Sequence, residues 1–203
     1  MRTEAMSYDL SSAVTAIAVH SLGGRITVTA GTGDTVRVTE TLRYTGARPT
    51  PEHRLDAAQL TFTSGCQGHQ GSCGVDYRIE VPSGVNATMD SAGGAITVDG
   101  LAGSLDLSTG GGALDATRIA STNLTARTAG GAAILDFVVP PGALRTDSAG
   151  GDITVRLPAG RYAVDARSDG GDTRIEVTAD PSAPHRIDVR ADGGDISLAP
   201  ATP

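Results

Sequence analysis

Apolar and polar residues alternate through the second half of the chain, in phase with regularly spaced Gly-Gly pairs. The pairs begin at residues 93, 111, 130, 150, 170 and 193. Alternation with a period of two is typical of strands that have one buried face. Each unit of about twenty residues therefore predicts a strand, a Gly-Gly corner, a second strand and a second turn. The inward column six residues before each pair contains Ala87, Leu105, Leu124, Leu144, Val164 and Ile187.

Two arrangements of these units fit the alternation. In a β-solenoid each unit is one coil, and equivalent residues of successive coils lie about 4.8 Å apart. In a meander each Gly-Gly pair is a hairpin turn. The charges three residues before the pairs favour the solenoid, because Asp147 would lie between Arg127 and Arg167 on adjacent coils and be attracted to both. We therefore expect an all-β fold with a parallel β-solenoid over residues 85–199.

The first part of the chain, residues 1–84, is less regular and is expected to form a β-rich cap that continues into the stack. A loop with room for a short helical turn is predicted over 46–58, and residues 200–203 form a short tail after the repeats. The alternation predicts five strands in the cap, over 13–19, 25–29, 35–43, 59–63 and 76–81.

Composition and charge limit the kinds of binding partner that can be expected. The chain has 203 residues, 27 of them Gly, only 3% aromatic residues and a net charge of -7. Small residues in this proportion favour short strands that stack closely. An acidic chain without a basic patch is not suited to a phosphate backbone, so we expect no nucleic-acid partner.

The hydropathy of the sequence also indicates in which cellular compartment the protein is expected. The N-terminal residues contain no uninterrupted apolar core of a signal peptide, and no stretch of the chain reaches 18 apolar residues. We therefore expect no direct membrane insertion and a cytoplasmic location. A cell-surface or extracellular location is the alternative.

The phrase CGVDYRIEVPSG over residues 73–84, followed by repeated Gly-Gly-x-Ile-x-Val, resembles the bacterial β-strand-repeat putative adhesin family, also called the toastrack domain. The resemblance covers residues 13–199. It implies a right-handed parallel β-helix and no enzymatic activity, for a domain whose function is unknown. Members are often tethered behind a membrane segment, a feature that this sequence does not show.

The only two cysteines, Cys66 and Cys73, flank a Gly-rich loop that closes easily. A disulfide between them is the favoured interpretation, and it would indicate an oxidising compartment. Free thiols are a second possibility. A metal or redox site is a third, because His69 lies between the cysteines, but a structural zinc site needs a fourth ligand and none is nearby.

The corners of the last repeats carry pairs of aspartates in equivalent positions: Asp169 and Asp172 at one corner, and Asp192 and Asp195 at the next. Asp152 continues the column. Stacked carboxylates of this kind would suit a weak calcium site. The alternative is that each Asp caps its own turn, which Asp often does beside Gly. No other cofactor is expected.

Catalytic motifs are missing from the sequence. The aromatic residues are scattered and the four histidines have no partner spacing, so no acid–base pair or sugar platform is evident. We therefore expect a non-catalytic binding or scaffold protein of the putative adhesin type, which contacts a protein or glycan surface and self-associates through an uncapped solenoid edge. The alternative is a carbohydrate-active enzyme or lectin-like module on the same scaffold.

Overall fold

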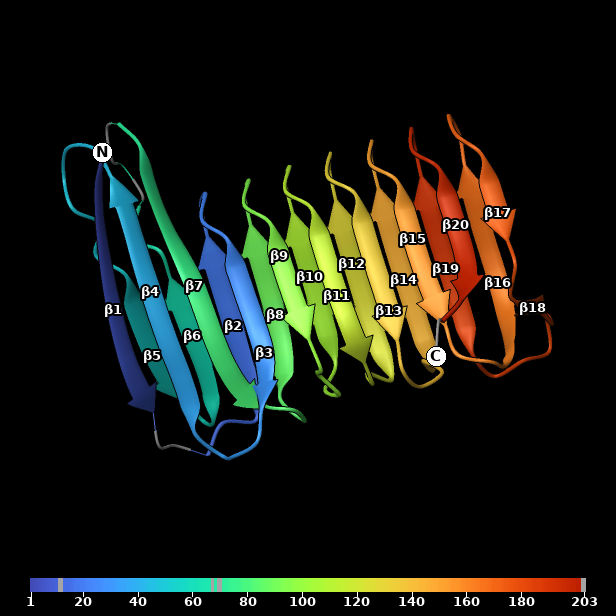
Figure 1. Ribbon diagram of the computed structural model, residues 1–203, viewed down its shortest axis with the longest axis horizontal. Coiled ribbons are helices and arrows are strands. Elements are labelled where there is room, and N and C mark those ends of the chain that lie inside the picture. The colour runs from blue at the N-terminus through green and yellow to red at the C-terminus, as the bar shows by residue number, and fades with distance from the viewer. Residues whose placement is uncertain (11–12, 67, 69–70, 202–203) are drawn as a thin grey trace.

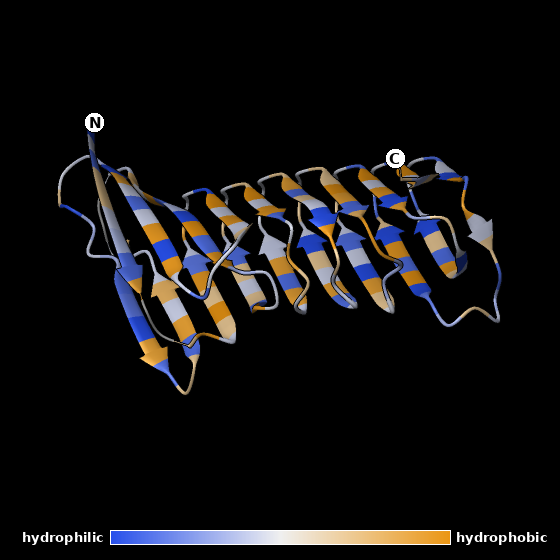
Figure 2. Cartoon of the chain, turned by 60° about the horizontal axis from the view of Figure 1, so that its bottom comes forward, coloured by the Kyte–Doolittle hydropathy of each residue, from blue (hydrophilic) through white to orange (hydrophobic). Residues whose placement is uncertain are grey.

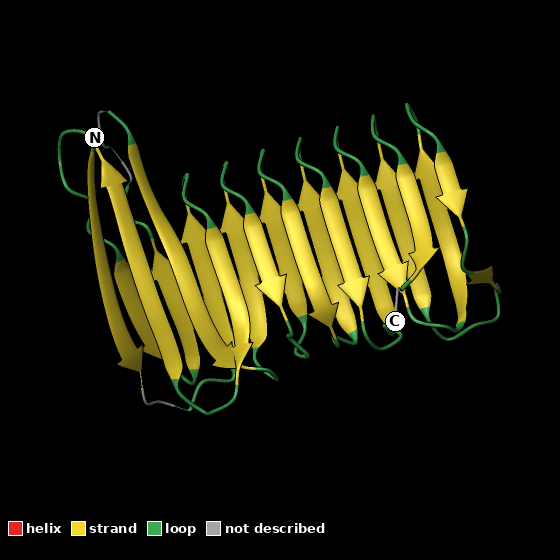
Figure 3. Cartoon of the chain, in the orientation of Figure 1, coloured by secondary structure: helices red, strands yellow, loops and turns green. Residues whose placement is uncertain are grey.

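The computed structural model describes residues 1–10, 13–66, 68 and 71–201, and these residues form strands and loops without a helix (Figures 1 and 3). The strands make two ten-stranded sheets. In spatial order, the first sheet contains β1 (Arg2–Leu10), β4 (Val36–Tyr44), β7 (Cys73–Pro82), β3 (Ile26–Gly31), β9 (Ile96–Asp99), β11 (Leu114–Ile119), β13 (Ala133–Phe137), β15 (Ile153–Leu157), β20 (Ile196–Pro200) and β17 (Thr173–Ile175).

The second sheet lies behind the first in Figure 1. In spatial order it contains β18 (Thr178–Ala179), β16 (Arg161–Ser168), β19 (Arg186–Ala191), β14 (Ala143–Ser148), β12 (Asn123–Thr128), β10 (Leu105–Thr109), β8 (Asn86–Ser91), β2 (Ala16–Ser21), β6 (Gln59–Thr63) and β5 (Glu52–Asp56). Each Gly-Gly corner therefore connects a strand of the second sheet to a strand of the first, and the corners are not hairpin turns.

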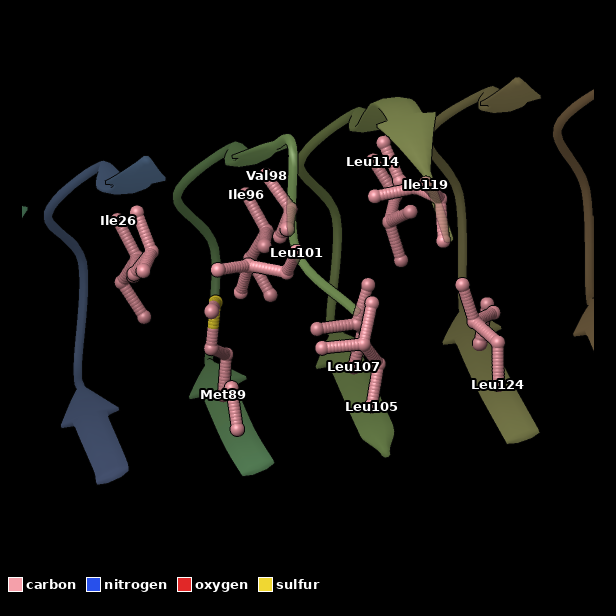
Figure 4. Packing of buried hydrophobic residues seen from close by; sticks show 14 of the residues in the cluster. Ile26, Met89, Ile96, Val98, Leu101, Leu105, Leu107, Leu114, Ile119 and Leu124 are labelled. Carbon is pink, nitrogen blue, oxygen red and sulfur yellow. The ribbon is translucent and has the colours of Figure 1, made fainter. Parts of the chain in front are cut away.

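The core lies between the two sheets. Alternate residues of each strand point inward, which appears in Figure 2 as alternating hydrophobic and hydrophilic bands along the strands. In Figure 4 side chains from the two sheets meet, among them Met89 and Leu107 from the second sheet and Ile96 and Leu114 from the first. All four side chains are buried. The inward register predicted from the alternation is confirmed.

Small polar residues two positions before each Gly pair hold the corners in shape. The Thr128 hydroxyl accepts a hydrogen bond from Gly131 N at 3.0 Å and donates to Gly131 O at 2.9 Å. In the preceding coil Thr109 accepts from Gly112 N and donates to Gly94 O of the neighbouring coil, each at 3.0 Å. These hydroxyls explain why Ser or Thr occupies five of the six positions in this column, the exception being Ala191.

The parallel stacking predicted for the repeats is present in the middle of the molecule, where β8, β10, β12 and β14 pair in parallel with equivalent residues side by side. The cap at the N-terminal end differs, because the pairs β1–β4, β4–β7 and β5–β6 are antiparallel. At the C-terminal end the pairs β16–β18, β16–β19 and β17–β20 are parallel. The fold is therefore all-β with two mixed sheets, rather than a solenoid that is parallel throughout.

The coils do not stack in sequence order at either end. Strands β2 and β3 lie between β6–β7 and β8–β9, and β19 and β20 lie between β14–β15 and β16–β17. The predicted neighbours of Asp147 are therefore only half correct. Arg127 is its register partner on one side, but Arg190 of β19 occupies the other side, and Arg167 lies one strand further out.

The cap contains two strands that the sequence did not predict. The five predicted strands correspond to β2, β3, β4, β6 and β7. The segment 46–58, predicted as a loop, contains β5, and residues 2–10 form β1. Both strands lie at sheet edges and are mostly exposed, so they lack the clean alternation that marks a strand with one buried face.

A candidate ligand-binding trough on the second sheet

A shallow trough of about 570 Å³ crosses the outer face of the second sheet beside the Gly-Gly corners. It runs over β8, β10, β12, β14 and β19, which are consecutive neighbours in the sheet. Five strands span about 19 Å between the first and the last. One side is lined by the residues three positions before each Gly pair, which are Asp90, Ser108, Arg127, Asp147 and Arg190.

The rest of the trough is lined mostly by residues with small side chains. The residues one position before each pair are Ala92, Gly110, Ala129, Ala149 and Asp192, so almost no side chain rises from this strip. The hollow exists because small residues alternate with the longer Asp and Arg side chains of the lining. The arrangement leaves room for an extended chain that lies across the strands.

Charges in the trough alternate in sign but are only partly paired. Arg127 donates to Asp106 on the neighbouring strand at 3.0 Å, and Asp147 accepts from Arg145 at 3.1 Å. Among the residues that the structure describes, none forms an ion pair or hydrogen bond with the side chain of Asp90 or Asp192. The trough therefore offers both donors and unpaired acceptors to a polar ligand.

A second hollow of about 430 Å³ continues the trough towards the cap and shares Asp90 and Ala92 with it. His20 of β2 lies in register with Asp90 there, and Glu52 and Ser64 complete the polar lining. The combined surface therefore extends from the cap to the C-terminal coils.

The loop beside this second hollow is cross-linked by a disulfide bond. Cys66 and Cys73 form a disulfide in the structure. Gly65 has a left-handed φ of +61°, and a Cβ there would overlap the carbonyl of Thr50, so this glycine is needed for the close approach of two loops. His69, the third residue of the metal interpretation, lies outside the described residues.

The aspartates proposed for calcium lie at exposed corners in a different arrangement. Asp195 Oδ1 accepts a hydrogen bond from Asp172 N at 2.8 Å, and Asp152 Oδ1 accepts one from Asp195 N at 2.9 Å. Asp169 and Asp192 lie on the other side of the Gly pairs and are exposed. Within the described ranges no group of three or more acidic, His or Cys side chains is placed to hold a metal ion. Asp195 and Asp152 therefore cap backbone N–H groups of neighbouring coils, rather than their own turns as the alternative predicted.

Asp195 provides a direct test of this capping between neighbouring coils. Asp195→Ala removes the acceptor for Asp172 N and is expected to lower the free energy of unfolding by about 1 kcal/mol, whereas Asp195→Asn keeps an acceptor oxygen and costs less than half as much. Thermal unfolding of the two variants measures the difference. Calcium in excess is expected to leave the melting temperature of the unsubstituted chain unchanged, and a clear rise would instead support a cation site.

One further polar cluster lies inside the cap, and no motif in the sequence indicated it. Glu40 is 2% exposed, and its Oε1 accepts a hydrogen bond from the Tyr8 hydroxyl at 2.8 Å. The Tyr8 ring stacks on His53 with centroids 4.9 Å apart. Burial, and then the hydrogen bond to Glu40, raise the pKa of the Tyr8 phenol above its usual value, so it stays a donor. The cluster joins β1, β4 and β5 across the end of the sheets.

Comparison with known proteins rests on the fold. No protein-family model and no curated protein matches the chain. Solved structures do match. A putative adhesin from Bacteroides fragilis is 14% identical and has a TM-score of 0.58, and the match covers 96% of this chain and 97% of that one. The chain shares the fold of this protein. A putative cell adhesion protein from Clostridium sporogenes, 10% identical, has a TM-score of 0.56 over 98% of this chain and 99% of its own.

The adhesin fold confirms the family resemblance at the level of architecture. Identities of this size concern the fold and do not transfer any binding residue. Neither neighbour is named as an enzyme. In the part of the chain that the structure describes, no helix is both long and apolar enough to cross a membrane.

Proposed function

We propose that the chain is a non-catalytic adhesion module that holds an extended, polar segment of a partner protein in the trough of the second sheet. The continuous trough across five strands, with Asp and Arg alternating along one side, is the observation that carries the proposal. Its span of about 19 Å matches about six residues of an extended peptide. The names of the two structural neighbours support an adhesive role.

The chemistry of the lining favours a peptide over a glycan. A peptide backbone offers regularly spaced donors and acceptors, which the Asp, Arg and Ser side chains of the trough can satisfy. Sugar-binding sites commonly use an aromatic platform, and no aromatic residue lines the trough. The lectin-like or carbohydrate-active alternative therefore lacks support from the surface that would serve it.

We also propose that the module acts outside the reducing cytosol. The Cys66–Cys73 disulfide supports this location, because such bonds persist mainly in oxidising compartments. The cytoplasmic expectation rested on hydropathy alone, because the sequence shows neither the apolar core of a signal peptide nor a stretch of 18 apolar residues.

A binding experiment with a matched control tests the trough. Short unstructured peptides rich in Ser, Thr, Lys and Glu are immobilised beside a glycan array, and the chain is applied to both. Arg127→Glu/Arg190→Glu is expected to weaken peptide binding at least about tenfold, since two donors are lost and like charges gather. Arg37→Glu/Arg78→Glu makes the same change of charge on the outer face of the first sheet and is expected to leave binding unchanged.

Two other outcomes of this experiment would contradict the proposed peptide binding. Glycan binding that the trough variant abolishes would replace the peptide proposal with the lectin-like one. Equal effects of the two double variants would show that net charge, rather than the trough, governs binding, and the proposed function would be wrong.

A further inference from the structure

The C-terminal end of the stack has two strands with a free edge. On the outer side of β16, β18 pairs only with Arg161 and Tyr162. Beyond these two residues, no other described strand pairs with the outer side of β16 or of β17. Free strand edges are ready templates for another chain unless they are covered.

The direction of the free backbone groups follows from the bonds on the inner side. Ala163 N and Asp169 N donate to carbonyls of the segment that contains β19, at 2.8 and 2.9 Å. Because donors alternate along a strand, the N–H groups of the even-numbered residues between them, including Ala166, point away from β19. On the first sheet Glu176 N donates to Leu198 O at 2.8 Å, so the N–H of Ile175 points outward in the same way.

The end also exposes apolar side chains that point towards the core. Ile175 is 43% exposed, although the equivalent residues Leu135 and Val155 in central coils are 0% exposed. Val164 and Ala166 pack against the core but remain only partly buried. A further pair of strands at this end would complete the burial of these side chains.

We propose that a second copy of this chain covers the end, related by a two-fold axis at the level of Ala166 and Ile175. Both residues lie four positions from the nearer glycine of the Gly170–Gly171 corner, so they are at one height on the two sheets. An axis normal to the sheets pairs residues 164–168 of β16, which lie in the part of the strand that β18 leaves free, with the same residues of the second copy, and pairs β17 with β17, antiparallel in each case. Both sheets then continue through the interface, and the outward N–H and C=O groups of Ala166 and Ile175 are paired.

Charge complementarity selects this register. With Ala166 opposite its own copy, Asp165 faces Arg167 of the second copy, and Arg167 faces Asp165. With Ile175 opposite its own copy, Arg174 faces Glu176 of the second copy, and Glu176 faces Arg174 of the second copy. One axis therefore gives four opposite-charge neighbours on the two outer faces. A shift by one residue would place Asp165 against Asp165 and leave the outward backbone donors without acceptors.

The opposite end of the molecule is less suited to such pairing. Its edge strands β1 and β5 are held together by the stack of Tyr8 on His53 and by the hydrogen bond between the Tyr8 hydroxyl and His53 Nδ1 at 3.2 Å. Every residue of β5 is exposed, and four of its five side chains are ionisable. The two ends therefore differ, and a head-to-head dimer rather than an open fibre is expected.

Sedimentation velocity over a series of concentrations tests the dimer. The unsubstituted chain is expected to dimerise reversibly. Arg174→Glu places like charges across two symmetric contacts and is expected to weaken the dimer about tenfold. Arg174→Glu/Glu176→Arg exchanges the charges, restores the contact with the second copy, keeps the pair within the chain and is expected to recover dimerisation.

Arg54→Glu is the matched control, because Arg54 pairs with Asp56 two residues away on β5, as Arg174 does with Glu176. It is expected to leave the dimer intact, and melting temperatures confirm that each variant folds. A chain that stays monomeric at every concentration would overturn the proposal. So would dimerisation that Arg54→Glu disrupts, or that the charge exchange does not recover.

Discussion

Gly131→Ala is expected to lower the free energy of unfolding by about 3 kcal/mol or more, while Gly130→Ala in the same corner changes it by less than about 1 kcal/mol. A Cβ at Gly131 would overlap the carbonyl of Gly112 on the neighbouring coil, which is backbone and cannot move aside. A Cβ at Gly130 meets nothing within 4 Å. Denaturant unfolding of the two variants measures both values.

The result would show what sets the spacing of the coils. The second glycine of each pair lies against the same glycine of the next coil, as Gly112 lies against Gly94 and Gly151 against Gly131. If Gly131→Ala and Gly130→Ala had equal effects, the close approach of backbones at the corner would not limit the stacking distance, and the repeat would have to be explained by turn conformation alone.

Reduction of the Cys66–Cys73 disulfide is expected to lower the free energy of unfolding by about 2.5 kcal/mol, the entropy that a loop of this size gains when it opens. Urea unfolding with and without dithiothreitol measures the change. The double variant Cys66→Ala/Cys73→Ala is the control, since dithiothreitol should have no effect on it. Identical unfolding of the oxidised and reduced chains would contradict the expectation and would remove the support for an oxidising compartment.

The middle of the molecule could be predicted because its signals are local and repeated. The columns around each Gly pair predicted directly which residues of β8 to β15 point inward. Apolar residues recur at every second position because those positions face the core. The hydroxyl ties at the corners, such as Thr128 on Gly131, could have been suspected from the column of small residues, but their partners depend on the turn.

The ends could not be predicted in the same way. The insertion of β19 and β20 beneath β16 and β17 depends on long-range packing. Its only trace in the sequence is a step of 23 residues between the last two Gly pairs in place of about twenty. The trough could not be predicted as a hollow either. Its lining residues were visible as the column that contains Arg127 and Asp147, but they were interpreted as pairing with one another rather than as facing a ligand.

The inserted coil sets an order for folding. A ribosome delivers β16 and β17 before β19 and β20, yet the earlier strands pair only with the later ones or with the short β18. The stack can therefore grow coil by coil from β8 to β15, as repeat proteins commonly do. It must then pause with β16 and β17 undocked until β19 and β20 have been synthesised and have inserted between them and the strands β14 and β15. Strands that come later in the chain thus complete the fold from within.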